Sequence, residues 1–369
     1  MRSAADRRVC WVALNLVLAD CLRPAQRLIA HFGSPENVLG APERDLEYLG
    51  LERERARSLA SPRLLDDAVR VLEAARRKGW QVITADDEPY PFLLTEIFDP
   101  PHVLYVAGDP AVLSCPAVAV VGARRPTPFG RAVAERLARD LAGLGLVVVS
   151  GLAVGIDSLA HWGALQSGRT VAVLGSGFDE VYPKENAELL RKIAATGAAV
   201  TEFPPAARPL AYRFPLRNRI ISGLALGVVV VEATLRSGSL ITARLALEQN
   251  REVMAVPGNV TSALSSGTNW LIKTGAKLVE TWADVVEELP APLRETLLTL
   301  KKEGGEARPE PSPEEKKIFD GLKTDALTHI DELVETTDIS VSEVLARLLS
   351  LELKGLVRQA PGKCFQRSL

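Results

Sequence analysis

Short apolar, mostly β-branched runs alternate with helical patterns between residues 118 and 256, and this alternation restricts the fold more than any other feature of the sequence. Continuously apolar runs of this length are typical of strands buried on both faces of a parallel sheet. The predicted strands are residues 118–121, 146–149, 171–174, 199–201, 228–231 and 252–256, and the predicted helices between them are residues 130–144, 157–166, 185–195, 217–226 and 240–249. Because each strand–helix–strand unit forms a right-handed crossover, we expect an α/β fold with a Rossmann-like, doubly wound, mostly parallel sheet. The runs 82–84 and 103–106 are expected to extend it.

Glycines follow several of these predicted strands. They include Gly122, Gly151, Gly155, Gly177 and Gly238, and helices begin directly after several of these turns. In open parallel sheets ligands bind at the carboxyl ends of the strands, where glycine permits close backbone approach and helix N-terminal amides attract anions. Each glycine alone could merely make a tight turn. Their concentration at one predicted edge favours a phosphate-binding site.

The distribution of charge is more informative than its total. With 44 Lys plus Arg against 46 Asp plus Glu, the net charge of −2 excludes a generally basic polymer-coating protein. Acidic residues are nevertheless absent between Asp109 and Glu135, and Glu232 is the single one between Glu202 and Glu248. The arginines in these two stretches are Arg124, Arg125, Arg131, Arg208, Arg213, Arg217, Arg219, Arg236 and Arg244. Because arginine donors suit phosphate oxygens, we expect a groove that follows a nucleic-acid backbone.

An aromatic residue lies within this arginine-rich segment. Phe214 stands among Arg213, Arg217 and Arg219, where its ring could stack on an unpaired base. The residues alone leave a second interpretation open, in which Phe214 belongs to the core and the arginines pair with acids on other segments.

Motifs for nucleotide cofactors and catalysis are missing or incomplete. There is no GxxxxGK[ST] sequence, and Glu180 occupies the third glycine position of the GxGxxG that begins at Gly175. Asp157 and His161 are four residues apart on one predicted helix, but no nucleophile accompanies them. We therefore expect no cofactor and no enzymatic activity.

The four cysteines are far apart and form no CxxC pair, which argues against a zinc site and a disulfide framework. Charged residues interrupt the start of the chain, and its longest apolar runs are far shorter than the ~20 residues of a membrane span. We therefore expect no metal, no membrane contact and a cytoplasmic location.

Smaller segments flank the sheet region on both sides. Residues 1–80 read as a small helical domain of the SAM or helix–hairpin–helix (HhH-like) kind, and the sheet region takes residues 81–290. Residues 291–312 are rich in Pro, Gly and Glu and are expected to form a flexible linker. Residues 313–369 predict three helices and a hairpin, as in a winged helix, but their 8 basic and 10 acidic residues fit a protein contact at least as well as DNA.

Several of the strand-end motifs occur together in one order. They read Val121-Gly122-Ala123-Arg124, Ser150-Gly151-Leu152-Ala153-Val154-Gly155-Ile156-Asp157, Gly175-Ser176-Gly177, Tyr182-Pro183-Lys184-Glu185-Asn186, Phe214-Pro215-Leu216-Arg217-Asn218-Arg219, Ser237-Gly238-Ser239-Leu240-Ile241-Thr242 and Val256-Pro257-Gly258. In this order they resemble the DNA-processing protein A (DprA/Smf) family, and the resemblance covers residues 81–290. The two flanking segments look like the accessory domains of that family.

This resemblance implies a protein that binds single-stranded DNA, dimerises through the Rossmann-like domain and loads the strand-exchange recombinase onto incoming DNA during natural transformation. It implies a DNA-binding site made of the following residues: Gly122, Arg124, Gly151, Gly155, Gly177, Lys184, Asn186, Phe214, Arg217, Asn218, Arg219, Ser237, Gly238, Ser239 and Thr242. Apolar residues within 264–279 are candidates for the dimer surface.

Two other functions remain open at this point. The fold also resembles phosphoribohydrolases that cleave nucleoside monophosphates, but Leu245 stands where their catalytic carboxylate would be required. A pure adaptor that docks proteins through its winged helix is the other alternative.

Overall fold

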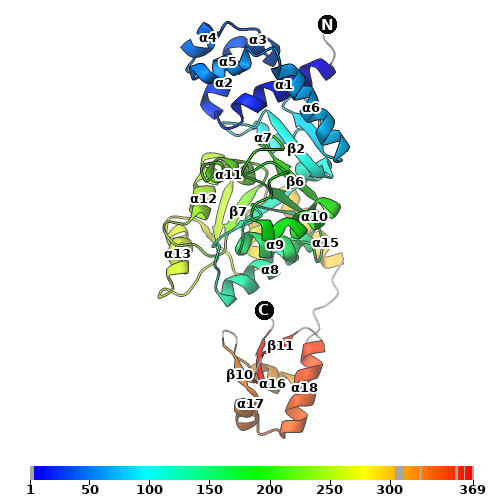
Figure 1. Cartoon of the computed structure of the whole chain (residues 1–369). Helices are drawn as coiled ribbons and strands as arrows, with labels where there is room; N and C mark the ends of the chain where they lie inside the picture. Colours follow the sequence, from blue (N-terminus) through cyan, green and yellow to red (C-terminus); the bar gives the residue numbers. More distant parts are fainter. Residues whose placement is uncertain (1–3, 304–310, 324–325, 354–355, 361, 368–369) are drawn as a thin grey trace. The chain divides into compact units, whose positions relative to one another are not determined.

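The computed structural model describes residues 4–303, 311–323, 326–353, 356–360 and 362–367. The chain divides into two compact units, residues 1–297 and residues 298–369 (Figure 1). Among the described residues, no helix has the length and apolar character needed to cross a bilayer.

The first unit is built on a nine-stranded sheet with the order β1-β2-β6-β5-β4-β3-β7-β8-β9. Its strands are β1 (Gln81–Thr84), β2 (Val103–Gly108), β3 (Ala117–Val121), β4 (Val147–Ser150), β5 (Thr170–Val173), β6 (Ala198–Thr201), β7 (Gly227–Val230), β8 (Glu252–Ala255) and β9 (Lys277–Leu278). From β6 to β9 all neighbours are parallel, whereas β1 and β2 join the edge antiparallel. The chain winds outward from β3 in both directions, so the expected doubly wound, mostly parallel sheet is confirmed. Its switch point lies between β3 and β7.

Helices bury both faces of this sheet. They are α7 (Phe92–Thr95), α8 (Pro128–Gly143), α9 (Ile156–Ala164), α10 (Ala187–Thr196), α11 (Arg213–Gly223), α12 (Gly238–Glu248), α13 (Ser266–Lys273) and α14 (Trp282–Glu287). Ala119 and Val121 of β3 pack in the core beneath α11, α12 and α13, whereas Val118 and Val120 pack against α8 and α9. This alternation explains why the strands are apolar at every position.

The N-terminal helices share a hydrophobic core with the sheet. They are α1 (Ala4–Leu18), α2 (Leu22–Phe32), α3 (Pro35–Leu39), α4 (Glu43–Tyr48), α5 (Arg53–Leu59) and α6 (Leu64–Arg77), drawn in blue in Figure 1. Leu14 and Leu28 belong to the same buried cluster as Tyr105 of β2 and Leu174 at the end of β5. Residue 80, expected to separate two domains, therefore lies inside one compact unit.

The segment expected to be a flexible linker begins as a helix. Helix α15 (Ala291–Glu303) packs Leu293 and Leu297 against the cluster that covers β3 and β7 on the α8 side. Because these two apolar residues are four apart, both side chains lie on one face of the helix. Their burial against the cluster stabilises the helical form of this part of the segment. Residues 304–310 of the expected linker lie outside the described residues.

The second unit contains the winged helix that the sequence predicts. Its elements are α16 (Pro313–Gly321), β10 (Thr328–His329), α17 (Ile330–Thr337), α18 (Val341–Leu353), β11 (Val357–Ala360) and β12 (Cys364–Arg367). The three strands form a sheet in the order β10-β12-β11, and Leu333, Leu348 and Phe365 lie in one core. Arg347, a basic residue of α18, forms an ion pair with Glu343 at 2.6 Å, which reduces the positive charge that the helix offers to DNA.

Candidate nucleic-acid interface

A groove of about 730 Å³ opens at the carboxyl ends of β3 and β7, where the strand order reverses. We call this cavity the groove. It is lined by Val121, Gly122, Ala123, Arg124, Arg125, Ala153, Asp157, Tyr182, Pro209, Ala211, Phe214, Pro215, Arg217, Asn218, Ile221, Thr234, Ser237, Gly238, Ser239, Ile241, Thr242 and Leu264. Of the fifteen site residues expected from the sequence, nine are among them: Gly122, Arg124, Phe214, Arg217, Asn218, Ser237, Gly238, Ser239 and Thr242.

The loop after β3 carries exposed arginines on a fixed backbone. Thr127 caps α8 and donates from its amide and its hydroxyl to the buried carboxylate of Glu232, at 2.9 and 2.5 Å. Gly155 has a φ of +91°, and its Cα lies so close to the carbonyls of Ala123 and Arg124 that a Cβ would collide with them. The backbone is therefore held from two sides, while the side chain of Arg124 is exposed to solvent at the groove.

The bottom of the groove contains two buried groups of opposite charge, Arg217 and Asp157. Arg217 is 4% exposed and donates to the carbonyl oxygens of Gly151, at 2.7 Å, and Val173. Burial lowers the pKa of Arg217 to about 10, so the guanidinium remains protonated at neutral pH. Burial raises the pKa of the neighbouring Asp157, and the Arg217 charge and backbone donors oppose that rise. Gly151 lies outside the groove lining, and its lack of a side chain leaves room for both of these groups.

Helix α11 positions the aromatic wall. Phe214, Arg217, Asn218 and Ile221 recur every three to four residues and so share the helix face toward the groove. Phe214 is half-buried: its ring lies over Gly175 and is 5.5 Å from the ring of Tyr182, in a tilted arrangement. Tyr182 is exposed and lines the groove, but the sequence reasoning did not select it. Its position directly before Pro183 and Lys184 is the feature of the sequence that could have indicated a role at the groove.

The opposite wall is the N-terminus of α12. No side chain caps this helix; Ser237 and Ser239 instead direct their hydroxyls toward each other at 2.9 Å. Uncapped amides and two hydroxyls at the positive end of an eleven-residue helix provide donors for a phosphate oxygen. Thr242 lies one turn further along the same helix.

The two acid-poor stretches contain arginines of two kinds. Arg213 pairs with Asp20 at 3.3 Å, Arg219 with Glu202 at 2.6 Å, and Arg244 with Glu248 at 3.6 Å. The exposed arginines that have no ion pair with any described residue are Arg124, Arg125, Arg131, Arg208 and Arg236. Both interpretations of the arginines therefore apply, each to a different subset. Of the unpaired subset, Arg124 and Arg125 line the groove.

Six expected site residues lie outside the groove lining: Gly151, Gly155, Gly177, Lys184, Asn186 and Arg219. Lys184, in the short 3₁₀ helix η2 (Lys184–Asn186), is exposed two residues after Tyr182. Asn186 is buried and donates to the carbonyl of Leu152 at 2.8 Å. Gly177 packs against the carbonyls of Pro204 and Pro205. Asn186 and Gly177 therefore support the surrounding loops.

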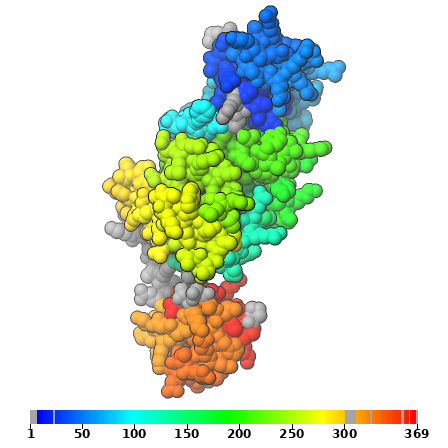
Figure 2. Space-filling model, turned by 90° about the vertical axis from the view of Figure 1, so that its left-hand side faces the viewer, coloured from blue at the N-terminus to red at the C-terminus, as the bar shows by residue number. Residues whose placement is uncertain are grey.

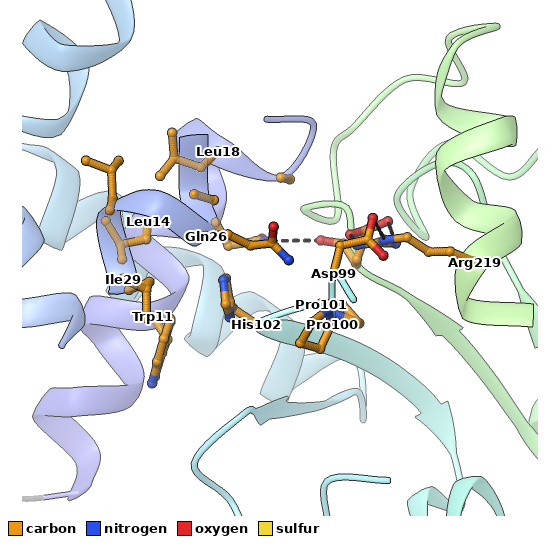
Figure 3. A pocket seen from close by; sticks show the side chains of 15 residues that line it. Trp11, Leu14, Leu18, Gln26, Ile29, Asp99, Pro100, Pro101, His102 and Arg219 are labelled. Carbon is orange, nitrogen blue, oxygen red and sulfur yellow. Dashed lines mark hydrogen bonds and ion pairs between the residues drawn. The ribbon is translucent and has the colours of Figure 1, made fainter. Parts of the chain in front are cut away.

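Arg219 occupies a different place from the expected one. It is 2% exposed, and besides Glu202 it contacts Asp99 at 3.1 Å. Figure 3 shows it beside a second, small cavity of about 30 Å³, across from Trp11, Gln26 and His102. His102 stacks on Trp11 with ring centroids 5.0 Å apart, and burial lowers its pKa to about 4. Because this cavity is about the size of one water molecule, it is part of the packing between α1, α2 and the sheet rather than a ligand site.

Asp157 and His161 do not form a catalytic pair. The Thr170 hydroxyl donates to the carbonyl of Val148 at 2.6 Å, so it accepts from Nδ1 of His161 at 2.7 Å. His161 Nε2 is then unprotonated and has no partner among the described residues. Burial lowers the pKa of His161 to about 3, as expected for a core imidazole. No group of three or more His, Cys, Asp or Glu in the described part of the chain could hold a metal ion.

A doubly wound sheet with a groove at its switch point defines a Rossmann-like α/β protein. The family can be stated as well. The chain belongs to the DprA/Smf family of DNA-processing proteins: the family model for DNA recombination-mediator protein A matches residues 81–290, and that for the DprA winged helix domain matches residues 303–363. The resemblance drawn from the strand-end motifs is thereby confirmed.

Individual relatives agree with this assignment. The chain is 39% identical over 340 residues to protein Smf of Escherichia coli, covering 90% of this chain and 89% of that one. It is 34% identical to the X-ray structure of DprA from Streptococcus pneumoniae, with a TM-score of 0.63, covering 76% of this chain and 98% of that one. The Helicobacter pylori protein, whose structure is described for its unique single-stranded DNA binding mode, is 32% identical with a TM-score of 0.51, covering 60% of this chain and 97% of that one.

Proposed function

We propose that the protein binds single-stranded DNA in the groove and acts as a recombination mediator without catalysing a reaction. The observation that carries this proposal is the combination of unpaired Arg124 and Arg125, the half-buried ring of Phe214 and the uncapped N-terminus of α12 in one groove. Unpaired guanidiniums contact phosphates, and an aromatic face accepts any unpaired base. The single-strand binding of the Helicobacter pylori relative supports the same assignment.

The test is a comparison of single-stranded with duplex oligonucleotides across a salt series. We expect tighter binding of single strands, and we expect Arg124→Ala and Lys184→Ala each to lower the slope of log affinity against log salt by about 0.7, the value for one phosphate. Arg244→Ala is the matched control, because Arg244 lies in the same acid-poor stretch but pairs with Glu248. Unchanged affinity and slope in both test variants would overturn the assignment.

We further propose that the bound single strand is protected and handed to the strand-exchange recombinase during natural transformation. The family assignment supports this role, and the near-neutral winged helix leaves the groove as the main DNA contact. The expected result is faster recombinase filament formation on single strands already covered by a single-strand-binding protein. A variant with Arg124→Ala and Lys184→Ala should lose this stimulation. Equal stimulation by that variant would separate mediator activity from the groove.

We propose the α12–α13 side of the first unit, which faces the viewer in Figure 2, as the surface of a homodimer. Leu247 of α12 and Trp270 of α13 are exposed there at 60% and 49%. Exposed apolar side chains on neighbouring helices mark a contact surface. Leu247→Arg with Trp270→Glu should convert a dimer to a monomer in light scattering, whereas Tyr48→Glu, on exposed Tyr48 of α4, should leave the mass unchanged.

The phosphoribohydrolase alternative predicts release of a base from nucleoside monophosphates. Leu245 of α12, where that activity would require a carboxylate, is partly buried. Base release by the purified chain would support this alternative against the proposed one.

A further inference from the structure

Among the described residues that line the groove, Asp157 is the only acidic one. It lies in the first turn of α9 and is 8% exposed. A negative charge at the bottom of the groove opposes the binding of any anion near it. The presence of Asp157 in a groove proposed to bind phosphates therefore needs an explanation.

The carboxylate of Asp157 is held by backbone amides from two strand ends. The amide of Gly151, after β4, donates to its Oδ2 at 3.1 Å. The backbone of Gly122, after β3, and of Ala153 also acts on this carboxylate and lowers its pKa. The guanidinium of Arg217 reaches the same glycine, Gly151, and its positive charge opposes the rise in the pKa of Asp157 that burial causes.

The residue type at position 151 fits this arrangement. A Cβ on Gly151 would lie 2.7 Å from Oδ2 of Asp157 and 2.6 Å from Nη2 of Arg217. Any side chain at position 151 would therefore collide with both charged groups and push them away from the end of β4. The glycine here leaves room for two side chains of the chain itself, whereas glycines at this place in nucleotide-binding sheets give a phosphate access to the backbone.

Amides from neighbouring strand ends, a helix N-terminus and an arginine are the groups that bind a nucleotide phosphate in this class of fold. We infer that Asp157 is a built-in anion: its carboxylate fills an oxyanion site made by the amides of Gly122, Gly151 and Ala153 and the guanidinium of Arg217, and so keeps the phosphates of free nucleotides out of the groove bottom. Anions must then bind at the other donors of the groove, which are the α12 N-terminus and the exposed Arg124 and Arg125. Asp157 thereby selects a nucleic-acid strand over a mononucleotide.

Removing the carboxylate tests this inference directly. Asp157→Ala leaves a cavity with three amides and a guanidinium, which should accept formate, acetate or inorganic phosphate. Asp157→Asn is the matched control, because the amide side chain keeps the volume and leaves no room for an anion. The readout is the thermal unfolding midpoint in sodium formate, acetate or phosphate, against sodium chloride at equal ionic strength.

We expect 100 mM formate to raise the midpoint of Asp157→Ala by about 2–4 °C relative to chloride, which corresponds to an anion dissociation constant on the order of 10 mM and a roughly tenfold gain in folding equilibrium. The parent chain and Asp157→Asn should show no difference between the salts. An equal response of all three, or no response of a folded Asp157→Ala chain, would overturn the inference.

If Asp157→Ala is recovered unfolded, the measurement becomes its refolding yield in formate against chloride. A higher yield in formate supports the inference, and equal yields contradict it. Because no nucleic acid is present, the outcome is independent of whether the groove binds DNA.

Discussion

The two terminal nitrogens of Arg219 lie 2.7 and 2.6 Å from the two carboxylate oxygens of Glu202, and both side chains are almost completely buried. Arg217, only two residues earlier on the same helix, faces the groove. Two residues along an α-helix correspond to a rotation of about 200°, so neighbouring arginines of one motif must serve opposite sides of α11. Arg217 supports the groove, whereas Arg219 attaches α11 to the interior of the first unit.

Replacing Arg219 with methionine should lower the free energy of unfolding of the first unit by about 3–5 kcal/mol, because Glu202 would be left as an uncompensated buried charge. Urea unfolding measures this change. The double variant Arg219→Met with Glu202→Gln should recover part of the loss, since it leaves no unpaired charge. Stability within about 0.5 kcal/mol of the parent in the single variant would show that the pair is open to solvent.

Asp20 should affect single-strand binding although it does not line the groove. Its carboxylate accepts from Tyr212 at 2.6 Å and pairs with Arg213 at 3.3 Å, which fixes the start of α11 against the N-terminal helices. Asp20→Asn is expected to weaken single-strand binding several-fold while leaving the salt slope unchanged, because no phosphate contact is removed. Fluorescence anisotropy across a salt series checks both quantities. A reduced slope would mean that Arg213 itself contacts the strand.

Phe214→Leu should weaken single-strand binding by about 1–3 kcal/mol, the contribution of one stacked base. Phe214→Trp should retain binding, because the larger ring still offers a stacking face. Titration of an oligonucleotide with a series of abasic sites is the decisive control: its affinity should be nearly the same for Phe214→Leu and for the parent. An equal loss on normal and abasic strands would assign Phe214 a purely structural role.

The buried imidazole of His161 and the partly buried one of His102 predict a loss of stability in acid. The pKa values of His161 and His102 are lowered to about 3 and about 4, from 6.5, so between these values and 6.5 the unfolded chain binds more protons than the folded one. The free energy of unfolding should then fall as the pH falls from 6.5 to about 4, by about 1.4 kcal/mol per pH unit for each histidine. His161→Leu and His102→Leu should each flatten this part of the profile in urea titrations. A profile with the parent slope in both variants would show that other groups cause the loss.

Much of the central sheet could be predicted because its signals are local. The six strands β3 to β8 begin and end within one residue of their predicted limits, since a run such as 228–231 is apolar on both faces, whereas the short parallel strand β9 was not predicted. The antiparallel pairing of β1 with β2 and the placement of β2 beside β6 could not be read from the sequence, because pairing between distant segments leaves no local pattern.

The same distinction applies to the groove. Arg124 and the Ser237–Ser239 turn were predictable from strand ends and charge. The partner of Arg213 was not, because Asp20 lies 193 residues away in sequence. Arg219 was misplaced for the same reason: its motif gives its helix but not the burial of Glu202 opposite it. The sequence shows where the charged residues are, but only the folded chain shows which of them are paired with another charge.

The shared core of the N-terminal helices and the sheet has a consequence for how such proteins change over evolutionary time. Tyr105 and Leu174 are covered by side chains from the helical region. Deleting or exchanging that region would expose them together to solvent. A relative without these helices must therefore have polar residues at the corresponding positions, or another segment that covers them. Loss of the helical region and substitution of these sheet residues must then occur together.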